Sequence, residues 1–193
     1  MRRSRLGLRL SREVHEMAAD TVSINRAPVL TLWATVVARR QGHDEDTALT
    51  LGKAVAGLNA QTKGRSLGIY GPPKAMRDGK PKKVGLGEDF WVQVCGRPVP
   101  VKNTDDGVRA VVKDQPIEPD KVRKYLTGKF GDSLEAVTDA MQQLAAAFEP
   151  EDLEGAAFGL YEQFRPKIAK GQKGWGQKGE LDLDLIRSLA EEE

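Results

Sequence analysis

Residues 28–60 read PVLTLWATVVARRQGHDEDTALTLGKAVAGLNA, and this stretch decides the expected fold. Its first part, 28–41, is apolar around most of the helical circumference, which is typical of a helix at the centre of a protein. Its second part, 46–60, combines leucine and valine at helical spacing with small residues that let another helix come close. A glycine ends the first helix and Asp44 or Asp46 can cap the second, so the pattern predicts a helical hairpin.

The rest of the chain changes its period twice. Residues 63–88 are rich in Gly and Pro and predict an extended basic loop. Residues 89–113 alternate with period two and predict a small meander, in which Pro98 and Pro100 mark an edge. Further helices are predicted at 11–21, 119–127, 133–148 and from residue 150 to Pro166. Gly128 is expected to stop the second of these, and a capping box from Asp132 to Glu135 is expected to start the third. A last helix is predicted from Leu181, where a short strand is also possible.

We therefore expect a mainly α chain with a small antiparallel β meander, an α+β fold. The order is a helical hairpin, a basic loop, the meander and then three to four helices. The expected parts are 1–62 (N-terminal helical part), 63–88 (basic loop) and 89–193 (meander and C-terminal helical part), gathered in one compact body.

Composition excludes several classes of protein. No stretch reaches the roughly 20 apolar residues of a membrane span, and the basic N-terminus lacks the apolar run of a secretory signal. Cys95 is the single cysteine, so it cannot form an intrachain disulfide or a multi-cysteine metal site. We expect a cytoplasmic protein without a membrane partner, metal or cofactor.

Charge is strongly segregated along the sequence. The whole chain has a net charge of +2, yet residues 1–12, 63–83 and 165–178 each sum to +5 or +6. The remainder is correspondingly acidic, and its acids lie on the predicted helices. Such segregation creates a local positive field, which favours a polyanionic partner.

The sharpest local motif is the repeat KGQKGWGQKG at 170–179. Its glycines permit close approach of the backbone, its lysines can neutralise phosphates, and Trp175 can stack on a base. The same stretch is also consistent with a hinge whose indole packs on the core. Tyr70, in the first basic loop, has the same two interpretations.

These features predict a nucleic-acid-binding protein that grips the phosphate backbone with little sequence specificity, on DNA rather than RNA. A homo-oligomer is left open. The candidate nucleic-acid-binding residues are Lys63, Arg65, Tyr70, Lys74, Arg77, Lys80, Lys82, Lys83, Arg165, Lys167, Lys170, Lys173, Trp175 and Lys178.

Three alternatives remain. The predicted hairpin could be a helix-turn-helix, although its second helix has few base-reading side chains at its N-terminal end. A protein-interaction module could use the acidic residues of the later helices, which are Glu149, Glu151, Asp152 and Glu154. A small enzyme could use Asp182 and Asp184 near Lys178, but no catalytic residue is assigned, because His15, His43 and Cys95 form no recognisable motif.

The runs at 30–37 and 48–60, and the run GWGQKGELD at 174–182, resemble a family of conserved bacterial proteins of unassigned function. These runs cover a small part of the chain. The resemblance implies a bacterial cytoplasmic protein and assigns no role to any residue.

Overall fold

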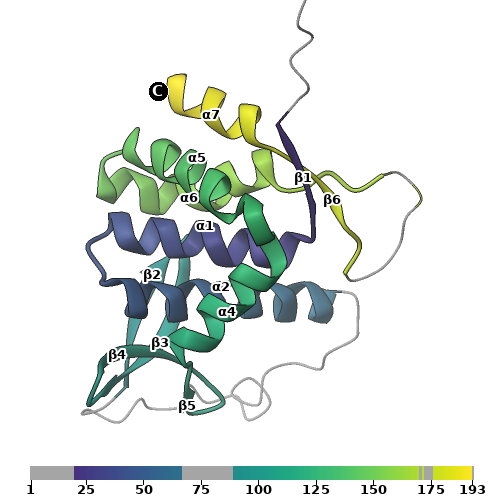
Figure 1. The fold of residues 1–193 in the computed structure, drawn as a ribbon. Coiled ribbons are helices and arrows are strands. Elements are labelled where there is room, and N and C mark those ends of the chain that lie inside the picture. Colours follow the sequence, from purple (N-terminus) through teal and green to yellow (C-terminus); the bar gives the residue numbers. More distant parts are fainter. Residues whose placement is uncertain (1–19, 67–88, 170, 172–175, 193) are drawn as a thin grey trace, which may run out of the picture.

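The computed structural model describes residues 20–66, 89–169, 171 and 176–192, and the structural statements that follow concern these residues. Helix α1 (Arg26–Arg40) lies at the centre, and every residue from Pro28 to Ala38 is buried. Helix α2 (Glu45–Ser66) returns antiparallel beneath it, and the two helices pack along their length (Figure 1). The predicted helical hairpin is confirmed.

The remaining helices pack on this hairpin and on one another. They are α4 (Pro119–Phe130), the short 3-10 helix η1 (Gly131–Ser133), α5 (Leu134–Ala146), α6 (Pro150–Phe164) and α7 (Leu183–Glu191). Figure 1 shows α5 and α6 above α1, with α7 outermost and α4 crossing in front of the hairpin. The Trp33 indole Nε1 donates to the Ala157 carbonyl at 2.8 Å, which joins α1 to α6 inside the core.

The meander is a four-stranded antiparallel sheet in the order β2-β3-β4-β5. Its strands are β2 (Asp89–Val94), β3 (Arg97–Thr104), β4 (Gly107–Val112) and β5 (Gln115–Pro116). Strand β3 is central, not an edge strand as predicted. Its prolines are nevertheless tolerated, because pairing with β4 covers residues 101–104 and leaves Pro98 and Pro100 with β2 alone.

A second, two-stranded sheet joins the two ends of the described chain. Strand β1 (Thr21–Ile24) pairs antiparallel with β6 (Gly179–Asp182). The helix predicted at 11–21 is wrong at its C-terminal end, because Thr21 already belongs to β1. The backbone groups of β1 form hydrogen bonds with β6, which is distant in sequence. Residues 11–19 lie outside the described part. The short strand left open near Leu181 is β6.

Three helix boundaries differ from the expectations. Helix α4 continues through Gly128 and ends before Gly131, whose positive φ of 55° interrupts the helical backbone. The expected capping box from Asp132 to Glu135 is wrong, since no side chain caps the start of α5. Helix α2 extends to Ser66, so the loop expected over 63–88 does not start at Lys63. The helix can continue because Lys, Arg and Ser are tolerated in a final helical turn.

The groove-reading interpretation of the hairpin is also wrong. The N-terminal half of α2 is covered by the larger sheet, and Thr47 and Thr50 are buried. The Thr50 hydroxyl accepts a hydrogen bond from the Ala110 amide of β4 at 3.0 Å. A recognition helix needs that end exposed.

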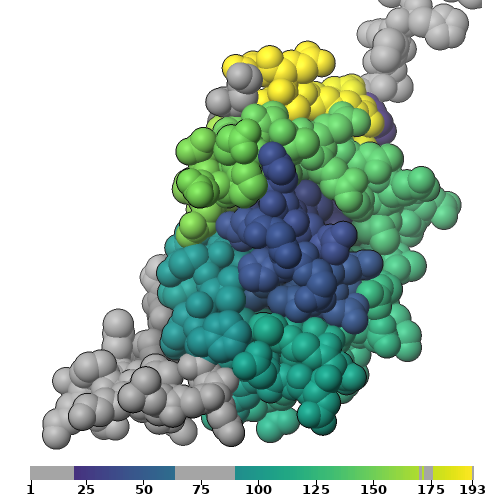
Figure 2. Space-filling view, turned by 90° about the vertical axis from the view of Figure 1, so that its left-hand side faces the viewer, coloured from purple at the N-terminus to yellow at the C-terminus, as the bar shows by residue number. Residues whose placement is uncertain are grey.

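The fold is α+β and mainly helical, as predicted. One cluster of buried apolar side chains takes members from both sheets and from α1, α2, α4, α5, α6 and α7. Figure 2 shows α1 and α2 on one face, between the sheet below and the later helices above.

Candidate anion-binding site

Four of the predicted nucleic-acid-binding side chains lie in the described part of the chain: Lys63, Arg165, Lys167 and Lys178. Arg65 is in α2, but its side chain lies outside the described residues. The same is true of Tyr70, Lys74, Arg77, Lys80, Lys82, Lys83, Lys170, Lys173 and Trp175, whose expected roles stay predictions.

The structure brings two of the four together. Lys63, near the end of α2, and Arg165, directly after α6, line one cavity of about 490 Å³. A third cation, Arg26 at the start of α1, lines it as well. Among the described residues that line this cavity there is no Asp or Glu, and its other polar side chains are those of Asn25, Asn59, Gln177 and Tyr161. We call it the cationic cavity.

Arg26 is fixed in position at an electrostatic cost. The Arg26 Nε donates to the Pro166 carbonyl at 3.0 Å. The backbone carbonyl of Arg26 in turn accepts a hydrogen bond from the Tyr161 hydroxyl at 3.4 Å. Burial lowers the pKa of Arg26, and the neighbouring Arg165 lowers it further. The first turn of α1 also carries no acidic residue, so this cation lies at the positive end of an uncompensated helix dipole.

Arg165 is half-buried, and its guanidinium has no hydrogen-bond or ion-pair partner in the described part of the molecule. Its backbone amide donates to the Tyr161 carbonyl at 2.7 Å and ends α6. The pKa of the Tyr161 hydroxyl is raised to about 12 by burial, so this group stays neutral beside the arginines. A cation near a helix C-terminus interacts favourably with the helix dipole, which accounts for the positions of Arg165 and Lys63. Arg26 lies at a helix N-terminus, so this explanation does not apply to it.

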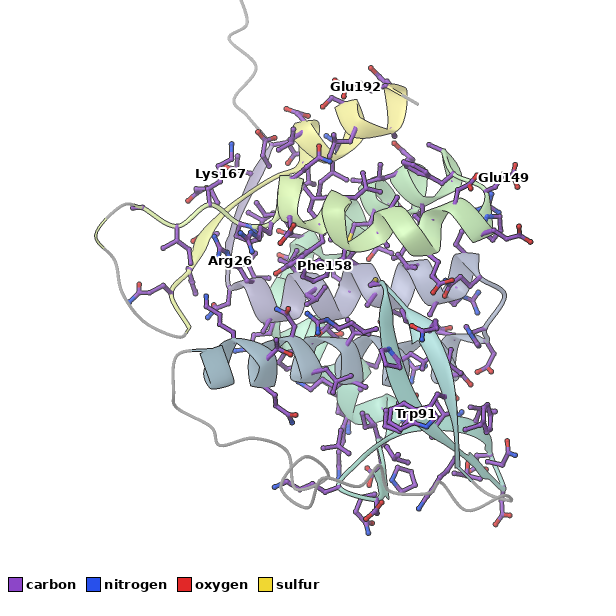
Figure 3. All side chains as sticks on the ribbon, turned by 180° about the vertical axis from the view of Figure 1, so that it is seen from behind. Arg26, Trp91, Glu149, Phe158, Lys167 and Glu192 are labelled. Atoms are coloured by element: carbon purple, nitrogen blue, oxygen red, sulfur yellow. The ribbon has the colours of Figure 1, made fainter. Side chains whose placement is uncertain are left out.

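The segment that follows α6 is anchored on both sides. Lys167 and Glu180 exchange backbone hydrogen bonds of 3.2 and 3.3 Å, and the Asn25 side chain donates to the Gly176 carbonyl. Lys167 and Lys178 are exposed on this segment. Figure 3 shows Lys167 and Arg26 at one end of the molecule and Glu149 at the opposite end.

Sequence reasoning missed Arg26, because it lies outside the three basic segments. The available signal was a cation at the first position of an apolar helix whose first turn has no acid. What the sequence did not show was that the ends of α2 and α6 would lie beside it.

A second cavity, of about 560 Å³, lies between α1, α2, α4 and α5 and is less suited to an anion. Its lining includes Glu45, and its Arg123 is already paired with Asp46 at 2.9 Å and with Asp120. Arg40 is also engaged, because it donates to the carbonyls of Ala145 and Phe148.

Three of the residues considered for an enzyme, Asp182, Asp184 and Cys95, have structural roles. The Asp182 carboxylate caps α7 by accepting from the Leu185 amide, and Asp184 pairs with Arg187 at 2.9 Å. Cys95 is buried in the β2–β3 turn, and burial raises its thiol pKa to about 12, so it is a core residue and not a nucleophile. Among the described residues, no group of three or more His, Cys, Asp or Glu is placed to hold a metal ion.

The acidic residues of the interaction-module alternative begin α6. Glu149, Glu151 and Asp152 are exposed there and Glu154 is half-buried, so they remain available for a basic partner; the alternative stays a prediction.

Comparisons of the chain with protein-family models, curated proteins and solved structures gave no match. The bacterial family resemblance therefore stays a prediction. In the part of the chain that the structure describes, no helix is long and apolar enough to span a membrane. The structure thus defines an α+β protein with a cationic cavity at one end.

Proposed function

We propose that this protein binds nucleic acid, DNA in preference to RNA, through the end of the molecule that holds the cationic cavity. The observation that carries the proposal is the convergence of Arg26, Lys63 and Arg165 on one cavity without a carboxylate among its described lining. Clusters of Arg and Lys bind phosphates and carboxylates in proteins, and phosphate is the anion that a nucleic acid offers.

The electrostatics of the site favour an anionic partner. Arg26 and Arg165 repel each other, and Arg26 opposes the dipole of α1. Natural sequences keep such unfavourable choices mainly where function requires them. A bound phosphate would remove both penalties, and the released counterions would add a favourable, salt-dependent term.

The surroundings extend the site from a single pocket to a surface. Lys167 and Lys178 are exposed on the segment beside the cavity. Acidic groups do lie nearby, since Glu180 pairs with Lys167 through the backbone and Glu162 is close enough to raise the pKa of Tyr161. The α6 end with Glu149, at the far end in Figure 3, would be repelled by a polyanion, which favours a single orientation.

The binding mode should have low sequence specificity. Helix α1 is buried over Pro28–Ala38, and the N-terminal half of α2, the end that a recognition helix would present to a groove, is covered by the larger sheet. The side chains at the site are the cations and amides of helix ends and of the segments beside them. Phosphate contacts of this kind position a nucleic acid without reading its sequence.

The proposal is tested by fluorescence anisotropy with labelled duplex DNA, single-stranded DNA and an RNA hairpin over roughly 50 to 200 mM salt. The variant R165Q/K167Q/K178Q removes three positive charges from the proposed surface. The matched control R39Q/K113Q/K124Q removes three charges from exposed positions elsewhere.

We expect the site variant to bind more weakly and the slope of log K against log salt to shrink by about 0.9 for each phosphate that the variant no longer neutralises. The control should retain the slope of the natural protein. Equal weakening in both variants would show that net charge alone acts, and no binding at the lowest salt to any of the three probes would refute the proposal.

A further inference from the structure

We infer that the cationic cavity takes a phosphate monoester, which is either the terminal phosphate of a nucleic-acid strand or a free nucleotide. The part of this inference that concerns the end of a strand rests on the proposed function. It deepens that function, because it names the chemical group that enters the cavity. The volume of about 490 Å³ lies in the range of small-molecule pockets, roughly 300 to 1,000 Å³.

The charge at the site matches a monoester better than a diester. A monoester carries a charge of about −1.5 to −2 near neutral pH, whereas each internal phosphate of a strand carries one negative charge. Two guanidinium groups and one ammonium group line the cavity. A dianion therefore compensates the repulsion between Arg26 and Arg165 more completely than a monoanion does.

The guanidinium groups are available for such a ligand. Arg26 uses its Nε for the Pro166 carbonyl, and within the described residues no hydrogen bond occupies its two terminal nitrogens. Arg165 has no side-chain partner among them either. A guanidinium can donate two parallel hydrogen bonds to a phosphate, so each arginine offers a bidentate contact.

The other lining groups suit a nucleoside. Leu30, Ala56 and Ile168 provide an apolar wall. The Asn25 amide nitrogen is used by the Gly176 carbonyl, which leaves its oxygen as an acceptor. The Asn59 oxygen accepts from Arg97 at 3.1 Å, which leaves its nitrogen as a donor. One acceptor and one donor are the groups that pair with the edge of a base.

Thermal-shift assays and calorimetry on the full chain test the inference with adenosine monophosphate, a dinucleoside monophosphate that has only a diester, and adenosine. Oligonucleotides with a 5′-phosphate, a 3′-phosphate or two hydroxyl ends test the strand end. The variants are R165Q, which removes a guanidinium that holds no other residue, R165K as the conservative change, and R39Q as the control.

We expect the monophosphate to raise Tm by mass action, the diester and the nucleoside to have at most a small effect, and a terminal phosphate to strengthen oligonucleotide binding about tenfold, equivalent to about 1.4 kcal/mol. R165Q should abolish this preference, R165K should keep part of it, and R39Q should keep all of it.

Equal binding of phosphorylated and unphosphorylated strands, together with no shift from the monophosphate, would overturn the inference and leave nucleic-acid binding intact. A shift from the monophosphate without binding of any strand would support the cavity as a nucleotide site and refute the proposed function instead.

Discussion

At the scale of single residues, two glycines of α2 show what one methyl group means at a helix contact. Gly52 is buried against α1, and a Cβ there would overlap the Thr35 hydroxyl and the Thr31 carbonyl. Gly57 lies on the exposed side of the same helix, and a Cβ there would meet no atom within 4 Å. The contact between α1 and α2 thus depends on the missing side chain at position 52.

We predict opposite effects of alanine at these two positions. Gly52→Ala should lower the free energy of unfolding by about 1–3 kcal/mol or more, because it overpacks a contact made partly of backbone. Gly57→Ala should raise it by about 0.5–1 kcal/mol, because it removes the entropic penalty of a helical glycine. Urea denaturation measures both, and a neutral Gly52→Ala would mean that the two helices can separate at no cost.

At the scale of elements, the start of α2 is fixed by one carboxylate. Asp44 accepts from the Thr47 amide at 2.9 Å and from the Thr47 hydroxyl at 2.7 Å. Both hydrogen bonds lower the pKa of Asp44, and the one from the hydroxyl contributes most. Asp44 and Asp46 were both candidates for this cap, and the geometry selects Asp44 because it lies three residues before Thr47, outside the helix.

We predict that Asp44→Ala lowers the free energy of unfolding by about 1 kcal/mol at neutral pH, the usual effect of losing an N-cap. A carboxylate whose folded pKa is lowered stabilises the fold above its unfolded pKa of about 3.9, and this contribution is lost as pH falls through the folded value. The difference between the natural protein and Asp44→Ala should therefore narrow in acid.

Asp44→Asn is the control for this cap, since its amide oxygen can still accept from the Thr47 amide. It should retain much of the stability at neutral pH. Chemical denaturation of all three proteins at neutral and acidic pH gives the comparison, and a constant difference at every pH would show that the charge of Asp44 has no part in the cap.

At the scale of the whole molecule, α1 is the element on which the others pack. Trp33 is fully buried, donates to α6 and stacks edge-on against Phe164 at 5.3 Å between ring centroids. Trp91, in contrast, is 54% exposed on β2. In the described part of the chain, one apolar cluster takes members from both sheets and from the helices. The expectation of one compact body stays a prediction, which the unfolding behaviour can test.

Trp33→Ala should lower the free energy of unfolding by about 3–5 kcal/mol, because it leaves a large cavity in the core. Trp91→Ala should change it by less than about 0.5 kcal/mol. If the chain is one body, far- and near-ultraviolet circular dichroism should report a single coincident transition in the natural protein. Two separate transitions would contradict the one-body expectation.

Local patterns along the chain were sufficient to predict much of the fold. The apolar run at 28–41, the alternation after residue 89 and the proline that ends α6 each encode an element through its neighbours in sequence, since helical and strand periods are local properties. The same reasoning failed at Gly128 and at Asp132, where the outcome depends on backbone angles that composition does not fix.

Tertiary structure alone decided the pairing of β1 with β6 and the place where Arg26 meets Lys63 and Arg165. These residues come from the beginning of one helix and the ends of two others, and the packing of α1 between α2 and α6 sets their separation. A sequence can show that a segment is basic. Which cations share one cavity is determined by long-range packing, because no local period relates the ends of different helices.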